Sequence, residues 1–200
     1  MKHLFVCPMD DTLKITSVDL RGDEPLYGAV TFQTYTPPEP SLYPYVASYF
    51  QQYNAQRKPL RQFLREHTGS ARPRDCLLAL HDDATDLEAH ALSELMIACG
   101  VRETLLEYRA FLLSGEPEYI AVTGSKRAVT LTHVISDTDD TERIFLPVNE
   151  AVPETVRDAI RELDAGRKLP AFSFGLPDAL MNIGETVTPQ ELLRNFLRIL

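Results

Sequence analysis

The sequence lacks the marks of a membrane-spanning protein, of a disulfide-rich secreted protein and of a general nucleic-acid binder. No apolar run approaches the roughly 18 residues that a membrane span requires. Only three cysteines occur, with no Cys-x-x-Cys pair, which excludes a disulfide framework and predicts buried thiols in a reducing cytoplasm. The net charge of −9 would repel a phosphate backbone, so we expect no nucleic-acid partner. The apolar core of residues 1–8 is too short for a signal peptide, and we expect a first strand there instead.

The common catalytic and metal-binding motifs are also missing. Gly-x-Ser-x-Gly, Gly-x-x-x-x-Gly-Lys-Ser/Thr and Gly-x-Gly-x-x-Gly do not occur, which removes the usual hydrolase, P-loop and dinucleotide-binding classes. His90 and Glu94 have a ligand-compatible spacing on one helix face, but no third ligand is in view. The acidic loop at 137–142 lacks the spacing and the central glycine of a calcium loop, which favours a solvated turn. We therefore predict no metal site.

What the sequence does contain begins with a pattern of strands. Strand signals at 3–7, 13–19 and 27–35 are joined by short connections rich in Pro, Gly and Asp, and they predict an antiparallel meander. A helix is predicted from Ser41 to Gly69, with a kink at Pro59. Its first part carries apolar residues at helical spacing, which favours core packing over a stacking platform: Leu42, Tyr45, Val46, Tyr49, Phe50 and Tyr53.

The next segment has the clearest local signals. Residues 76–80 form an apolar run typical of a buried parallel strand. Thr85 and Glu88 have the spacing of a capping box, and Gly100 stands where the following helix should end. The buried stripe of that helix is predicted at Leu87, Ala91, Leu95 and Ala98, and a short strand is predicted at 104–107.

The second part of the chain repeats this order of elements. Strand signals at 119–123, 128–135 and 143–148 are followed by a helix from Pro153 to Gly166. An irregular stretch then leads to a final helix with a capping box at 188–191. The repeated order predicts an α/β protein of two similar halves, 1–115 and 116–200, although the residues themselves are not repeated.

Residues 76–115 resemble the bacterial actin homologues that determine rod shape and, more distantly, the heat-shock chaperone ATPases. Leu77-Leu78-Ala79-Leu80 matches that family's buried strand, and the residues from Thr85 to Leu92 match its Thr-Glu-x-Glu-Arg-Arg-Ala-x helix start. Ala98-Cys99-Gly100-Val101-Arg102-Glu103 matches its turn before the next strand. The resemblance implies an actin-like fold of two ribonuclease-H-like halves, of which the second is shortened.

Measured against this family, three places have lost the acids that its chemistry needs. The first phosphate hairpin, Val6–Thr12, has no glycine and carries Cys7-Pro8 where the family has its metal-side Asp. The second, Ile120–Lys126, has one glycine and no Asp. The family's Glu-Glu-Pro falls at Tyr108-Arg109-Ala110. His81-Asp82-Asp83 follows a strand, where catalytic groups of α/β folds usually lie, but the resemblance makes it the turn before the capping box.

Two hypotheses follow. The first is a non-catalytic, degenerate actin-like protein, without cofactor, that binds another protein or itself. The partner surface would involve the last helix (Leu193, Phe196 and Leu197) and a basic segment that includes Arg61 and Arg65. For the last helix, packing on its own domain is the favoured alternative, and for the basic segment a solvated helix face and loop is favoured over a docking surface for an acidic partner. The second hypothesis is an enzyme that binds ATP and magnesium. Asp10, Asp11 and the loop at 137–140 would supply the replacement acids, and Lys126 would touch phosphate. The residues predicted to bind the nucleotide lie at the two hairpin tips: Asp10, Asp11, Thr12, Gly124, Ser125 and Lys126.

Overall fold

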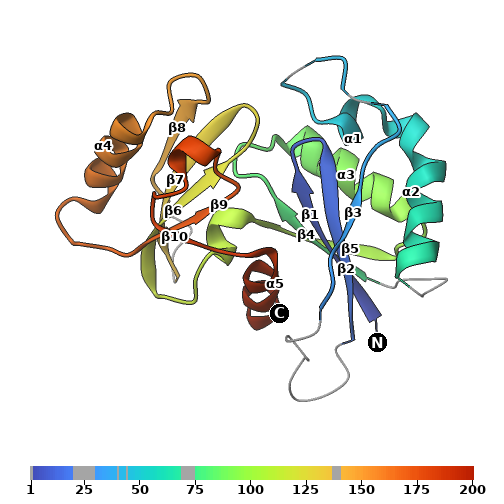
Figure 1. Ribbon diagram of the computed structural model, residues 1–200. Helices are drawn as coiled ribbons and strands as arrows, with labels where there is room; N and C mark the ends of the chain where they lie inside the picture. The colour runs from blue at the N-terminus through green and yellow to red at the C-terminus, as the bar shows by residue number, and fades with distance from the viewer. Residues whose placement is uncertain (1, 20–29, 40, 44, 69–74, 137–140) are drawn as a thin grey trace. The chain divides into compact units, whose positions relative to one another are not determined.

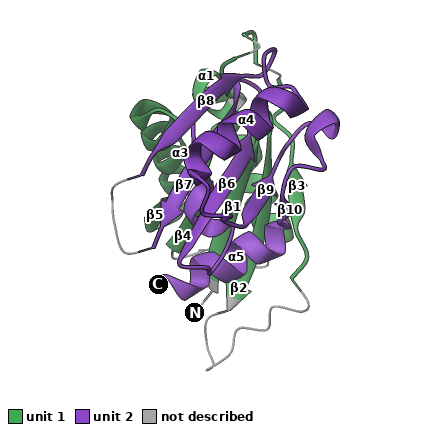
Figure 2. Ribbon diagram, turned by 90° about the vertical axis from the view of Figure 1, so that its left-hand side faces the viewer, with its two compact units in different colours: residues 1–80, 84–107 green, residues 81–83, 108–200 purple. Residues whose placement is uncertain are grey.

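The computed structural model describes residues 2–19, 30–39, 41–43, 45–68, 75–136 and 141–200 (Figure 1). The chain forms two compact units, one of residues 1–80 and 84–107 and the other of residues 81–83 and 108–200 (Figure 2). Each unit is built on a five-stranded sheet. The short segment 81–83 therefore belongs to the second unit, although the strand before it and the helix after it belong to the first.

The first sheet has the strand order β3-β2-β1-β4-β5. Its strands are β1 (Lys2–Met9), β2 (Thr12–Asp19), β3 (Gln33–Tyr35), β4 (Asp75–Leu80) and β5 (Glu103–Tyr108). The first three pair antiparallel as predicted, and β4 lies parallel to β1. The third strand was predicted at 27–35. Residues 33–35 form β3, residues 30–32 are irregular, and residues 27–29 lie outside the described residues. The interior strands β1 and β4 are buried, as their apolar runs require.

The second sheet repeats this topology in the order β10-β9-β6-β7-β8. Its strands are β6 (Glu118–Gly124), β7 (Ala128–Ile135), β8 (Arg143–Pro147), β9 (Ala171–Phe174) and β10 (Glu185–Thr186). The meander β6-β7-β8 is antiparallel, and β9 lies parallel to β6 just as β4 lies parallel to β1. The prediction of an irregular stretch after Gly166 was wrong, since it contains β9 and β10.

The helices of the first unit are α1 (Ser48–Gln51), α2 (Tyr53–His67) and α3 (Asp86–Ala98). The predicted helix start at Ser41 was wrong: the described residues of 41–47 form bends and turns. Pro44 accounts for this, because a proline disfavours the helical conformation at the residue before it. Two residues of the predicted apolar stripe, Leu42 and Tyr45, are consequently 78% and 62% exposed. The helix continues through Pro59 and ends at His67.

Helix α3 confirms the signals at its two ends. The Thr85 Oγ1 accepts from the Glu88 backbone N–H, and the Glu88 carboxylate accepts from the Thr85 N–H. Gly100 has a φ of +110°, which the end of the helix requires and which favours glycine. The buried stripe was only partly predicted, because Leu87 is 63% exposed whereas Leu92, Leu95 and Met96 are buried.

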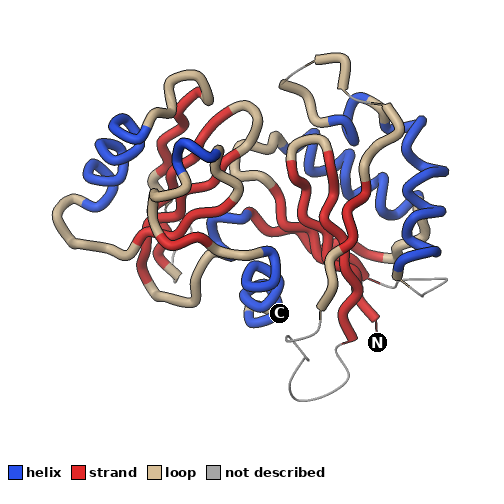
Figure 3. The backbone as a smooth tube through the Cα atoms, viewed as in Figure 1, coloured by secondary structure: helices blue, strands red, loops and turns tan. Residues whose placement is uncertain are grey.

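The second unit carries η2 (Arg109–Leu112), α4 (Pro153–Asp164), η3 (Asp178–Leu180) and α5 (Pro189–Arg198). Helix α4 packs on β6 and β7 (Figure 3). Val156 and Leu163 of this helix join four strand residues in the core: Ile120, Val122, Val129 and Leu131. Both α4 and α5 begin with a proline in the first turn, where the missing N–H costs little. Among the described residues, no helix combines the length and apolar composition that crossing a bilayer demands.

Candidate functional site

A cluster of polar and charged residues lies inside the second unit, around the turn between β6 and β7. The segment 81–83, which directly follows β4, supplies three of its members. Arg109 enters from the start of η2, and Thr123, Ser125 and Arg127 come from β6 and the β6–β7 turn. We call these seven residues the hairpin cluster.

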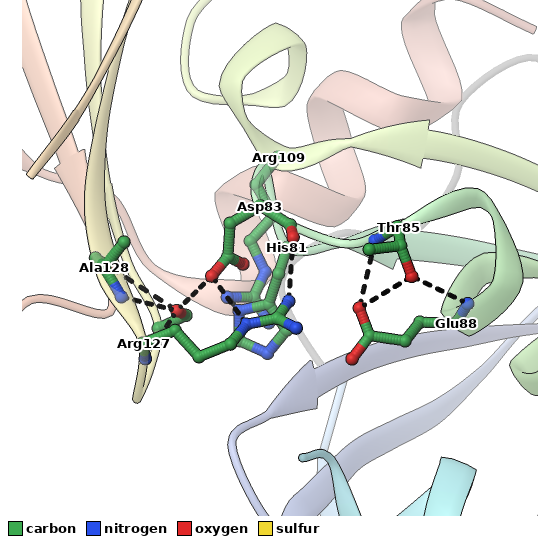
Figure 4. Close-up of polar contacts among 8 residues, drawn as sticks. His81, Asp83, Thr85, Glu88, Arg109, Arg127 and Ala128 are labelled. Carbon is green, nitrogen blue, oxygen red and sulfur yellow. Dashed lines mark hydrogen bonds and ion pairs between the residues drawn. The ribbon is translucent and has the colours of Figure 1, made fainter. Parts of the chain in front are cut away.

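Arg109 is the most buried member of the hairpin cluster, with an exposure of 0%. Its Nη1 lies 2.9 Å from the Nδ1 of His81 (Figure 4). Its guanidinium carbon lies 5.1 Å from the centre of the Phe174 ring. Burial, reinforced by the charge of Arg109, lowers the pKa of His81 well below its usual 6.5. The imidazole is therefore neutral, and its Nδ1 accepts a hydrogen bond from the arginine.

Asp82 fixes the start of η2 to the end of β6. One carboxylate oxygen accepts from the backbone N–H of Ala110 at 2.9 Å, and the other accepts from the Thr123 hydroxyl at 2.5 Å. Burial raises the pKa of Asp82 above its usual value. These hydrogen bonds and the charge of Arg109 act in the opposite direction but are outweighed. The hydroxyl of Tyr119 donates to the Ala110 carbonyl at 2.7 Å, so both backbone groups of Ala110 are bonded.

Asp83 holds the tip of the β6–β7 turn. Its Oδ2 accepts from the Ser125 hydroxyl at 2.6 Å and from the Arg127 Nε at 3.0 Å. The Nη2 of Arg127 also donates to the main-chain carbonyl of Asp83 at 2.8 Å (Figure 4). The Asp83 side chain is only 9% exposed, so this ion pair is partly shielded from water.

Three backbone donors of the turn are used within the turn itself. The Ser125 Oγ accepts from the N–H groups of Arg127 and Ala128 at 3.0 and 3.1 Å, and the Ser125 N–H donates to the Ala128 carbonyl at 2.9 Å. A loop that cradles phosphate must instead direct its N–H groups toward the ligand. The three N–H groups of Ser125, Arg127 and Ala128 are therefore committed to protein oxygens.

Gly124 permits a close approach at the end of β6. A Cβ at this position would lie 2.2 Å from the carbonyl oxygen of Gly175, which follows β9. The glycine is thus needed because two backbone segments touch, which is one of the reasons that strands contain glycine.

The residues predicted for a nucleotide site fall into two groups. Asp10, Asp11 and Thr12 form the tip of the β1–β2 hairpin in the first unit, where both aspartates are exposed. Gly124, Ser125 and Lys126 lie at the β6–β7 turn in the second unit. The predicted acidic residues at 137–140 lie outside the described residues. Across the described part of the chain, no three His, Cys, Asp or Glu side chains are grouped so that they could hold a metal ion.

The predicted partner residues divide differently. Leu193 and Phe196 are 1% and 2% exposed, and α5 packs on η2 of its own unit. Packing within their own unit covers these two side chains, and a partner contact through them stays a prediction. Leu197 is half-buried, whereas Arg61 and Arg65 are exposed on α2.

Sequence reasoning missed most of the hairpin cluster. It singled out the 81–83 segment as a possible site of chemistry, and it noted Arg109 only as a lost acid. The contacts of Thr123 and Arg127 were not predicted. The available signal was the placement of three polar residues, His81-Asp82-Asp83, directly after the apolar strand β4.

The fold of the whole chain was compared with those of known proteins. No family model matches the sequence, and no curated protein matches it either. The structure is similar to the ethanolamine utilization protein EutJ from Carboxydothermus hydrogenoformans. The TM-score is 0.61 at 9% identity, over 98% of this chain and 88% of that one. It is also similar to the cytoplasmic domain of EpsL, an inner membrane component of the type II secretion system of Vibrio cholerae. There the TM-score is 0.51 at 10% identity, over 99% and 95% of the two chains.

These neighbours have the actin-like ATPase fold. This chain has an actin-like fold. The predicted class, with two ribonuclease-H-like halves, is confirmed by these structures and by the repeated strand order. At identities near 10% the similarity shows the fold alone. The boundary at residue 115 stays a prediction.

Proposed function

We propose that this chain is a non-catalytic protein of the actin-like fold that works by binding another protein and uses neither nucleotide nor metal. The proposal builds on the fold, which is known for enzymes and for other proteins alike, so function has to be argued from the site. The three buried, free cysteines support a reducing compartment such as the cytoplasm.

The observation that carries the proposal is the self-satisfied β6–β7 turn. Its N–H groups at Ser125, Arg127 and Ala128 donate to oxygens of the turn itself. The nearby carboxylate, Asp83, is ion-paired with Arg127. Binding a metal-bound triphosphate here would require breaking these contacts before any new ones form, and the freed groups would lose bonds worth about 1 kcal/mol each.

A second support is the charge at the position of the family's Glu-Glu-Pro. Arg109 is buried there against a neutral His81. A guanidinium has no acceptor and does not lose its proton, so it cannot activate a water by accepting a proton from it. It serves instead to link the segment 81–83 to η2.

The proposal is tested by thermal unfolding with ATP and magnesium. A ligand present at 100 times its dissociation constant would stabilise the protein by about 2.7 kcal/mol, a shift of several degrees. We expect no shift, either for the natural chain or for Lys126→Ala. A rise in Tm that Lys126→Ala removes would overturn the proposal and favour the nucleotide-binding alternative.

A further inference from the structure

Helix α2 carries a line of exposed arginines. Arg57, Arg61 and Arg65 are spaced four residues apart, so they share one face of the helix. We call them the α2 basic row. At a rise of 1.5 Å per residue, the row extends over about 12 Å.

A hollow of about 540 Å³ lies beside the first two arginines of the row. Its lining comes from the start of α2 and the end of α3 and contains three cations and no acid: Asn54, Ala55, Arg57, Lys58, Arg61 and Ala98. Asn54 and Ala55 belong to the first turn of α2, where the helix dipole also favours negative charge.

The cations of this surface have no ion-pair partner among the residues that the structure describes. Within the described residues, neither the α2 basic row nor Lys58 forms an ion pair. Glu66, which is the one acid of α2, accepts a hydrogen bond from Gln62 at 2.8 Å instead. The surface is thus a local reversal of charge in a chain whose net charge is −9.

We infer that the α2 basic row and its hollow bind an acidic helical segment of a partner protein. The inference rests on the proposed function and names the chemistry of the partner. A single phosphate spans too short a distance to meet three guanidiniums over about 12 Å, whereas a helix with carboxylates at i, i+4 and i+8 repeats the spacing of the row. The local charge reversal would steer such a segment to this face and repel it elsewhere.

The test is fluorescence anisotropy of a labelled helical peptide with glutamate at every fourth position, at low salt. We expect binding that weakens about tenfold or more in the variant Arg57→Glu/Arg61→Glu, since each reversal replaces attraction with repulsion. The matched control is Arg157→Glu/Lys168→Glu, which makes the same change in net charge at exposed sites of the second unit and should leave the affinity unchanged. Equal weakening by both variants, or no binding, would overturn the inference.

Two further arms identify other occupants. Displacement of the peptide by tripolyphosphate at the same molar concentration would assign the hollow to a small anion and overturn the inference. Self-association in sedimentation that Arg57→Glu/Arg61→Glu abolishes would assign the row to a second copy, with the same consequence. The nucleotide test is independent: loss of peptide binding with no response to ATP removes the acidic partner only, whereas a response to ATP removes the proposed function.

Discussion

The hairpins β1–β2 and β6–β7 hold equivalent places in two sheets of the same strand order, yet their tips differ in chemistry. The first tip consists of Asp10 and Asp11, both exposed, with Asp10 in the left-handed region at a φ of +47°. The second tip is bonded to Asp83, with Gly124 against the backbone of Gly175. The two sheets thus share one strand order, while one turn is exposed and the other is half-buried and held by Asp83.

The largest effect is expected when the hairpin cluster loses Arg109. Arg109→Ala should destabilise the protein by about 3–5 kcal/mol, because it opens a cavity in place of one of the largest fully buried side chains and leaves the His81 Nδ1 without its donor. The control Arg102→Ala removes an arginine whose side chain is 65% exposed and should cost less than about 1 kcal/mol. Urea unfolding measures both.

Hydrogen exchange locates that effect. In Arg109→Ala we expect β6 and β7 to lose protection before β1 and β2, since the cluster lies in the second unit. Equal loss of protection in both hairpins would show that Arg109 does not stabilise the β6–β7 hairpin in particular.

A smaller effect is expected at Gly124. Gly124→Ala places a Cβ 2.2 Å from a backbone oxygen, and overpacking of this kind costs about 1–3 kcal/mol. Gly115→Ala is the control, because the nearest atom there is the mobile end of the Arg198 side chain at 3.1 Å. Thermal unfolding that ranks the two variants equally would show that the approach of Gly124 and Gly175 does not restrain the turn.

The smallest effect concerns pH. The folded state lowers the pKa of His81, so below the usual 6.5 the unfolded chain binds a proton that the folded chain does not. The contribution of His81 to the free energy of unfolding is therefore fully present above that pH. It falls as the pH drops, by up to about 1.4 kcal/mol per pH unit. The raised pKa of Asp82 acts in the opposite sense, and its contribution falls as the pH rises above 3.8.

The comparison of variants isolates the histidine. The free energy of unfolding, measured with urea between pH 5.5 and 7.5, should change less with pH in His81→Asn than in the natural chain. Asp82 is present in both. The matched variant His90→Asn, at an exposed position of α3, should keep the natural slope. An unchanged slope in His81→Asn would mean that His81 is not held neutral.

Local signals in the sequence located much of the fold. The capping box at Thr85 and Glu88 and the stop at Gly100 are interactions between residues close in sequence, so their spacing suffices to find them. Strands β9 and β10 were missed because four and two residues are too few to display a period. Helical spacing at Leu42 and Tyr45 was misleading, since it took no account of what Pro44 does to the residue before it.

The hairpin cluster was harder to predict, because it joins residues far apart in the chain. Arg109 and His81 are 28 positions apart, and Arg127 and Asp83 are 44 apart. A charged residue after a strand is usually exposed, and only the topology of the second unit reveals that Arg109 is enclosed. Burial of a charge depends on partners that composition and periodicity do not encode.

The position of residues 81–83 has a consequence for dissecting the protein. These three residues belong to the second unit, and their neighbours on both sides belong to the first. Neither unit is therefore a continuous stretch of sequence. A fragment that begins at residue 108 would contain Arg109 without the His81 imidazole that it bonds, and Thr123 and Arg127 without the carboxylates of Asp82 and Asp83. Expressing such a fragment alone should yield a poorly folded product, and supplying residues 75–107 as a separate chain should restore it.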